Sequence, residues 1–260
     1  TYDLLGAYAN LESPIDERTT LTLGGRYTFA EAEAGRVEDS VTGDTISITG
    51  EWDAIVGSAR LSREISPDRV FLFGGVAQGF RAPNLSDLTR LDSARTNEIE
   101  TPSPDLEPEH FLTYEVGLRY KKDRLGFAAS LFHTDIKDMI VRTPTGNIID
   151  GDNEVTKVNV GDGFTEGIEF SATFKLVENW LLWANITWLD GEVDTYPTSA
   201  PNKVREPVDR LMPMMWQAGA RWTCEACHFH IEGLVRAAQD ADELSSRDAA
   251  DTSRIPPGGT

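Results

Sequence analysis

The feature that most constrains the fold of this chain is the alternation of short and long connections between strand-like segments. In ten segments the side chains alternate between apolar and polar with a period of two, the pattern of β-strands that turn one face to an apolar phase. These segments cover residues 2–10, 18–30, 51–63, 69–82, 109–121, 125–141, 157–175, 179–191, 209–223 and 227–239. The short connections are residues 11–17, 64–68, 121–124, 176–178 and 224–227, and the long ones are residues 31–50, 81–108, 142–156, 190–208 and 240 onward. This order predicts an all-β, antiparallel up-and-down sheet whose two rims differ.

The parity of the connections favours a transmembrane β-barrel over a soluble sandwich. Barrels of bacterial outer membranes carry short turns on the periplasmic rim and long loops on the extracellular rim. A sandwich with Greek-key connections has no reason to keep a strict alternation. We therefore expect about ten strands of a larger outer-membrane barrel, with the long connections on the outside of the cell.

The two faces of the segments fit the wall of such a barrel. One face carries apolar and aromatic side chains, such as Tyr114 with Tyr120 and Trp216 with Trp222. Trp180 and Trp188 share a face, and at ~3.3 Å per residue and a tilt near 40° they stand roughly 20 Å apart along the membrane normal, close to the ~25 Å apolar band of such barrels. The opposite face carries mid-strand charges, which are costly in a dry core unless they are paired; they are Glu115, Arg119, Glu169, Arg221, Glu232 and Arg236. We expect a wide lumen that is wet or filled by a plug.

Composition excludes two classes of protein. The formal net charge of −19 argues against nucleic-acid binding, which requires clustered Lys and Arg. The mean hydropathy of −0.33 excludes a helical membrane protein, although it does not argue against a barrel, in which only every second residue faces lipid. The acidic long connections indicate a solvated surface, with divalent-cation bridging near lipopolysaccharide as the alternative. No signal peptide opens the chain, which begins within a strand and ends in a loop, and we expect an internal fragment.

Four segments, at this order and spacing, resemble the barrel of TonB-dependent outer-membrane receptors. They are Gly79 to Leu88, Pro104 to Tyr120, Leu131 to Ile140 and Gly163 to Phe170. The first contains Phe80-Arg81-Ala82-Pro83-Asn84, which ends a strand and opens a long loop. We expect this motif to order the base of that loop, because Pro83 fixes its own φ and disfavours helix at Ala82. A direct contact of Arg81 with ligand is the alternative.

The resemblance implies a twenty-two-stranded barrel plugged from inside by an N-terminal globular domain. Residues 1–260 would then be a partial barrel domain near the tenth to nineteenth strands, without the plug domain or the closing C-terminal strands, to which residues 255–259 would lead. The implied function is TonB-coupled uptake of a scarce nutrient complex through the outer membrane. The protein is not expected to be an enzyme. The implied partners are the TonB complex through the plug, outer-membrane lipid and lipopolysaccharide, and a small-molecule chelate. The family implies no catalytic residue, cofactor or resident metal.

The ligand is expected to be a ferric siderophore, because such ligands are the commonest in the family. Cobalamin, haem and glycans remain open. A passive outer-membrane porin or adhesin, without plug or energy coupling, is the first alternative function. A soluble β-sandwich enzyme or binding module is the second.

The pair Cys224 and Cys227 lies in a predicted tight turn between two strands. We expect a cross-turn disulfide, since the turn would face an oxidising periplasm and the spacing suits the bridging range. Free thiols, covalent haem at the C-x-x-C-H pattern and a zinc site with His228 and His230 are the alternatives.

Overall fold

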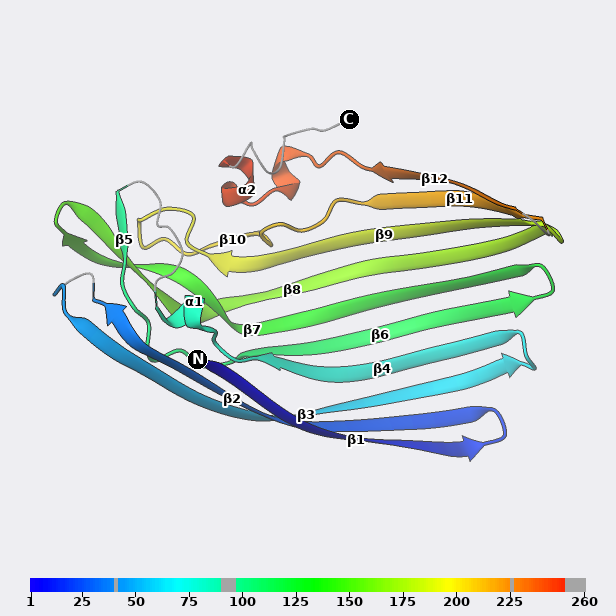
Figure 1. The fold of residues 1–260 in the computed structure, drawn as a ribbon, viewed down its shortest axis with the longest axis horizontal. Coiled ribbons are helices and arrows are strands. Elements are labelled where there is room, and N and C mark those ends of the chain that lie inside the picture. Colours follow the sequence, from blue (N-terminus) through cyan, green and yellow to red (C-terminus); the bar gives the residue numbers. More distant parts are fainter. Residues whose placement is uncertain (40–41, 90–96, 225–226, 251–260) are drawn as a thin grey trace.

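The computed structural model describes residues 1–39, 42–89, 97–224 and 227–250. Its strands form one sheet, which is antiparallel except for the pairing of β5 with β8. The strands run in the order β1-β2-β3-β4-β6-β7-β8-β9-β11-β12, so each long strand pairs with its neighbours in the chain. Figure 1 shows the short turns gathered at one end of the sheet and the long connections at the opposite end. The predicted all-β up-and-down architecture is confirmed.

Several strands extend past their neighbours at the end of the sheet that carries the long connections. The long strands are β1 (Tyr2–Asp16), β2 (Thr19–Glu38), β3 (Thr45–Ser66), β4 (Val70–Arg81), β6 (Glu109–Lys122), β7 (Leu125–Ile149), β8 (Asp152–Val177), β9 (Trp180–Thr195), β11 (Met215–Thr223) and β12 (His228–Arg236). Two short strands join the sheet beside this path: β5 (Glu98–Glu100) pairs with β8, and β10 (Val204–Pro207) pairs with β9. The helical turns are α1 (Leu85–Leu88), the 3₁₀ turn η1 (Ala241–Glu243) and α2 (Ser246–Ala250).

Two of the predicted long loops are wrong, because the strands continue through them. β2 and β3 stay paired as far as Glu38 and Thr45, and β7 and β8 as far as Ile149 and Asp152. These upper hairpins lie beyond the apolar band, so their side chains lose the strict apolar alternation by which the strands were read. Residues 209–214 are also not strand, since β11 begins at Met215.

The outer face of the sheet is apolar and exposed. Ile55, Val116 and Leu131 are 80%, 53% and 52% exposed, although each sits in the interior of a strand. Large apolar side chains left exposed in a contiguous row mark a surface that is covered in the working protein. On an outer-membrane barrel the cover is lipid.

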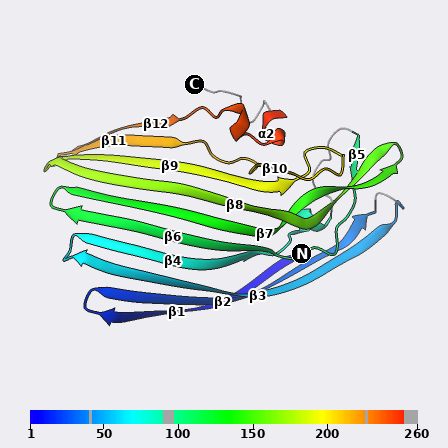
Figure 2. The same cartoon turned by 180° about the vertical axis from the view of Figure 1, so that it is seen from behind.

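The sheet has two unpaired edges, at β1 and β12, as Figure 2 shows from behind. Every residue of β12 is exposed. An open edge is a row of unpaired backbone groups, which cannot face hydrocarbon. The described sheet is therefore part of a wall that neighbouring strands complete. The expected lead-in at residues 255–259 lies outside the described residues.

The buried apolar core lies at the end of the sheet with the long connections. It joins Ala30, Ile48 and Trp52 of β2 and β3 to Leu88 and Leu106 of the connection between β4 and β6. The Trp52 indole donates a hydrogen bond to the Leu106 carbonyl at 2.9 Å. The long connection therefore folds back against the lumen face of the wall instead of extending into solvent. None of the helices in the described parts of the chain has the length and apolar character to cross a membrane.

Candidate functional site

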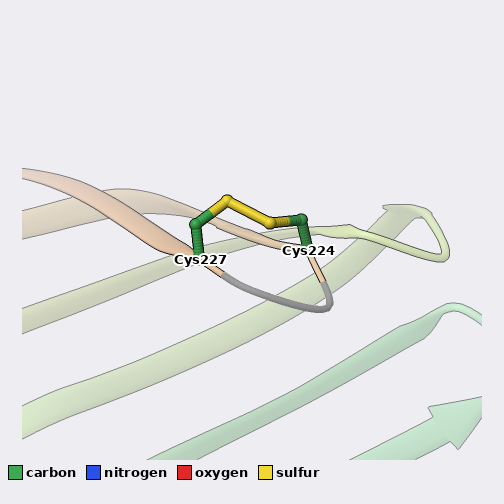
Figure 3. Close-up of a disulfide and its surroundings, with 2 residues drawn as sticks. All are labelled: Cys224 and Cys227. Carbon is green, nitrogen blue, oxygen red and sulfur yellow. A yellow bond between two sulfur atoms is a disulfide. The ribbon is translucent and has the colours of Figure 1, made fainter.

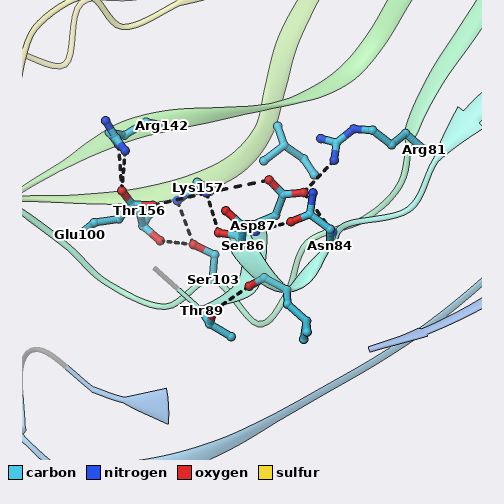
Figure 4. A network of polar contacts seen from close by, with 12 residues as sticks. Arg81, Asn84, Ser86, Asp87, Thr89, Glu100, Ser103, Arg142, Thr156 and Lys157 are labelled. Atoms are coloured by element: carbon cyan, nitrogen blue, oxygen red, sulfur yellow. Dashed lines mark hydrogen bonds and ion pairs between the residues drawn. The ribbon is translucent and has the colours of Figure 1, made fainter. Parts of the chain in front are cut away.

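The best-defined polar site is the base of the connection between β4 and β6, which we call the rim loop (residues 82–108). Figure 4 shows its side chains meeting those of β7 and β8. Arg81, the last residue of β4, donates two hydrogen bonds to the Glu109 carboxylate at 2.6 and 2.7 Å. Glu109 is the first residue of β6 and is 4% exposed. This fork therefore ties the two strands together where the rim loop leaves and re-enters the wall.

Arg81 also holds the first turn of the rim loop. Its guanidinium donates to Asp87 at 2.7 Å. The hydrogen bonds to Glu109, opposed in part by burial and supported by Asp87, raise the pKa of Arg81 above its ordinary value. Glu109 in turn accepts from the Ile140 backbone of β7 at 2.9 Å. One arginine thus links four segments of the rim.

The helical turn α1 begins at Asn84 with a capping box. The Asn84 side chain accepts from the Asp87 backbone at 3.0 Å, and the Asp87 carboxylate accepts from the Asn84 backbone at 3.0 Å. This reciprocal pair satisfies donors that the start of a helix otherwise leaves free. Ala82 and Pro83 are buried beneath the turn. Phe80, near the end of β4, packs against the core cluster.

A second ionic cluster anchors the middle of the rim loop to β7 and β8. Glu100, whose side chain is 1% exposed, accepts from Arg142 at 2.6 and 3.0 Å. Lys157 lies 3.6 Å from the same carboxylate and donates to the Ser86 carbonyl at 2.7 Å. Since Lys157 is also 3.8 Å from Asp87, the two clusters are joined through it. Each buried charge has an opposite partner, which is the condition for keeping such groups in a protein interior.

Uncharged hydrogen bonds fix the return of the rim loop to β6. Ser103 lies 2.8 Å from the Thr156 hydroxyl and accepts from the Lys157 backbone at 2.9 Å. Asn159 accepts from the Glu107 backbone and donates to its carbonyl at 2.9 and 2.7 Å. The described part of the rim loop is therefore a fixed element of the wall.

The lumen face below the rim is lined by aromatic rings, carboxylates and arginines, and Arg60 and Arg119 lie over the Phe73 and Phe71 rings. Phe73 lies across Gly117 on the neighbouring strand, where an added Cβ would stand 2.2 Å from the ring. A cavity of about 290 Å³ beside it is lined by Phe73 and Glu169 with Ser130, Ser171 and Thr187. In the described chain neither Glu115 nor Glu169 has an ion pair or hydrogen bond, although both face the lumen.

The opposite rim carries the cysteine pair. Figure 3 shows Cys224 and Cys227 joined as a disulfide across the turn between β11 and β12, with their Cα atoms 5.1 Å apart. The Cys224 backbone donates to the Cys227 carbonyl at 2.8 Å. His230 pairs with Glu232 at 3.4 Å instead of joining the sulfurs.

Sequence reasoning found the motif but missed its partners. Phe80 to Asn84 lie together at the loop base, and Arg81 is placed among protein carboxylates. Asp87 and Glu109 lie within the segments that carry the resemblance but were given no role, and Glu100, Arg142 and Lys157 were not singled out. Glu109 could have been found from the motif, because it opens the strand that follows the rim loop. Asp87 is held by Arg81 and Asn84 of the same motif. Arg142 and Lys157 pair across β7 and β8, and the pairing of β5 with β8 brings Glu100 to them.

A match to a protein-family model identifies the family of this chain. The model for the β-barrel of TonB dependent receptor-like proteins matches residues 1–257. The chain therefore belongs to the TonB-dependent receptor β-barrel family, and its strands are part of an outer-membrane barrel.

Relatives and solved structures agree with this assignment. The chain is 30% identical over 160 residues to an iron-regulated outer membrane virulence protein of Vibrio cholerae, a match that covers 57% of this chain and 24% of that protein. It has the fold of the copper transporter OprC (TM-score 0.71, 18% identity, 94% of this chain and 36% of the transporter). It also has the fold of the siderophore receptor PiuA of Acinetobacter baumannii (TM-score 0.68, 14% identity, 94% of this chain and 35% of the receptor). The match thus spans about a quarter of the length of the curated relative.

Proposed function

We propose that this chain forms part of the wall and of the extracellular rim of a receptor. The receptor takes up a ferric siderophore, which is a metal chelate, by a TonB-coupled mechanism. Residues 1–260 are a partial barrel domain in this proposal, and a plug domain and closing strands belong to the rest of the protein. The chain performs no catalysis. Its role is to hold the plug, line the path and shape the outer mouth.

The observation that carries the proposal is the pair of lumen-facing carboxylates without partners, Glu115 and Glu169. Unpaired carboxylates beside an aromatic ring suit an occupant that brings cationic side chains, because Glu115 offers charge and Phe132, its cross-strand neighbour, offers a π-face. The Phe73 ring already has the Arg60 guanidinium 4.2 Å from its centroid. The cavity at Glu169 supports this, since no Lys or Arg lines it. A plug inside the barrel would supply such groups.

The ligand is proposed to arrive already chelated. All four histidines and both cysteines are among the described residues. His110 and His133 lie on the outer face, and His228, His230 and the disulfide lie at the periplasmic end. This wall therefore offers a bare metal ion or a haem iron no imidazole or thiolate at its outer mouth. The iron-regulated relative and the siderophore receptor support iron as the metal.

The test is uptake of ⁵⁵Fe-siderophores by cells that carry or lack the intact gene, each with and without TonB. We expect accumulation that needs both the gene and TonB. Uptake that needs the gene but is unchanged without TonB would make the protein a passive porin. Saturable uptake of copper, cobalamin or haem in place of iron would keep the mechanism and change the ligand.

A further inference from the structure

The charge of the lumen face changes sign toward the periplasmic mouth. Glu115 and Glu169, the carboxylates that the plug is proposed to meet, lie higher on β6 and β8. Farther along the same faces, toward the short turns in Figure 1, come Arg119 and Lys121 on β6 and Lys175 on β8. A chain with a formal net charge of −19 therefore gathers cations at this end of its lumen wall.

These cations stand around a hollow of about 380 Å³, which we call the basic hollow. Its volume falls within the range of ligand pockets, about 300–1,000 Å³. The floor consists of small side chains of β7 and β8, which pair with each other and with Arg119 and Lys121 on the lumen face: Gly126, Ala128, Ser171 and Thr173. The long cationic side chains thus surround a floor that no large side chain fills.

Most of the charge in the basic hollow is free to meet a ligand. The charged residues that line it are four cations and one carboxylate: Arg119, Lys121, Arg124, Lys175 and Asp123. In the described chain the side chains of Arg119, Lys121 and Lys175 have no ion pair or hydrogen bond, and all three residues are exposed. Arg119 lies over the Phe71 ring, 5.6 Å from its centroid, and Arg124 spends one donor on the Leu176 carbonyl at 3.2 Å.

The neighbouring wall does not cancel this charge. On one side Glu64 lies across β4 from Arg119, and its carboxylate accepts from the backbone of the β3–β4 turn. On the other side Arg221 lies across β9 from Lys175 and adds a cation. The turn between β8 and β9 adds the carboxylate of Glu178. The cations in and beside the basic hollow therefore outnumber the carboxylates.

We propose that the basic hollow binds an anionic metal chelate as it leaves the barrel for the periplasm. The ligand class is a chelate with catecholate or carboxylate oxygens on its surface, because such oxygens accept charge-assisted hydrogen bonds from Lys and Arg. A cleft lined by one sign of charge also raises the local concentration of the opposite ion. The inference rests on the proposed uptake of a chelate and narrows that chelate to an anion.

The test measures block of the open pore by two chelates, with the full-length receptor in planar bilayers and mild urea to loosen the plug. The probes are a ferric tris-catecholate, which is negatively charged, and a ferric tris-hydroxamate, which is uncharged. The variant combines Arg119→Gln with Lys175→Gln. The matched control is Lys122→Gln, because Lys122 follows Lys121 on β6 but faces outward. Heat-modifiable gel mobility without urea establishes that each variant is folded.

We expect the tris-catecholate to block the wild-type and Lys122→Gln pores at a concentration at least fivefold lower than the tris-hydroxamate. The double variant should lose this preference. Equal block of the wild-type pore by both chelates, or a preference that survives in the double variant, would overturn the proposal. Steady conductance of the double variant before urea would also overturn it, because the hollow would then hold the plug. Block needs no TonB, so failure of the proposed transport is seen separately, in ⁵⁵Fe uptake.

Discussion

The two rims of the sheet are built by opposite means. On the periplasmic rim, turns of a few residues join strands that are neighbours in the chain, and backbone hydrogen bonds such as that of Arg69 to the Ser66 carbonyl suffice. On the extracellular rim, side chains tie residues far apart in sequence: Lys157 to Ser86 across 71 positions, and Ser199 to Glu98 across 101. The short rim needs only local order, while the outer rim depends on a few buried charges. Changes at those charges should therefore weaken the outer rim and leave the periplasmic rim unaffected.

The largest effect is expected from Glu100→Ala. The change leaves Arg142 and Lys157 without the carboxylate between them, and losing one member of a buried ion pair costs about 3–5 kcal/mol. Hydrogen exchange at residues 97–108 and 153–159 should quicken accordingly, with no change at the β11–β12 turn. Asp105→Ala, an exposed site in the same loop, is the control. Unchanged protection of the rim loop in Glu100→Ala would show that packing alone holds it.

Arg81→Ala should cost less, about 2–3 kcal/mol of local opening energy, because the Arg81 side chain is 40% exposed while the side chain of its partner Glu109 is 6% exposed. Arg81→Lys keeps the charge but loses the two-pronged contact and should fall between wild type and alanine. The readout is exchange at the Thr89 and Ser103 amides. Arg63→Ala, in an exposed pair 3.9 Å from Asp16, should have no measurable effect.

Gly117→Ala tests the lumen wall between the rims. The new methyl group would stand 2.2 Å from the Phe73 ring and must push it into the lumen, at a cost of about 1–3 kcal/mol. Urea unfolding of the intact receptor measures the loss. Gly25→Ala, with no atom within 4 Å of the new carbon, is the matched control. Equal midpoints for the two variants would mean that Phe73 does not pack as described.

Cys224→Ser should have a smaller and local effect. A disulfide that closes a four-residue turn removes little chain entropy from the unfolded state, about 2 kcal/mol at most. Faster exchange should be confined to β11 and β12, with the rim loop unchanged. Thiol labelling of the wild-type protein before and after reduction checks the bond itself: labelling without reductant would show free cysteines.

The smallest effect concerns pH at the tip of the β7–β8 hairpin. Burial would raise the pKa of Glu154, but hydrogen bonds from Asn147 and Thr145 outweigh it and lower the pKa below its ordinary 4.5. A carboxyl with a depressed pKa in the folded state stabilises the fold above its unfolded pKa and loses that contribution as pH falls through the folded value. The hairpin tip should therefore loosen only below about pH 4.5. Glu154→Gln should remove this dependence, and persistence of the dependence in the variant would assign it to another group.

The same difference between the two rims explains how much of each could be predicted from the sequence. The strand pattern and the short turns depend on local alternation, so the ten strands and their up-and-down order could be read in advance. The upper hairpins at residues 31–50 and 142–156 could not, because pairing outside the membrane does not require alternating polarity. β5 depends on pairing with β8 more than fifty positions away, which no local pattern reveals.

The site divides in the same way. Pro83 and Asn84 act on their own neighbours, so a turn at the loop base could be expected from them. The role of Glu100 depends on Arg142 and Lys157, which come from two other strands and meet it only in the folded rim. The end of β3–β4 pairing at Ser58 and Ala77 likewise has no signature in sequence, because the strand pattern of residues 51–63 and 69–82 continues past it.

The central claim is that this wall surrounds a plug, to which Glu115 and Glu169 turn their charges. Single-channel conductance of the full-length receptor in planar bilayers tests it most directly. The account predicts no steady conductance from the native protein, and open-pore conductance once mild urea loosens the plug. A large, stable conductance from the untreated, folded receptor would contradict the account and identify the barrel as a passive pore.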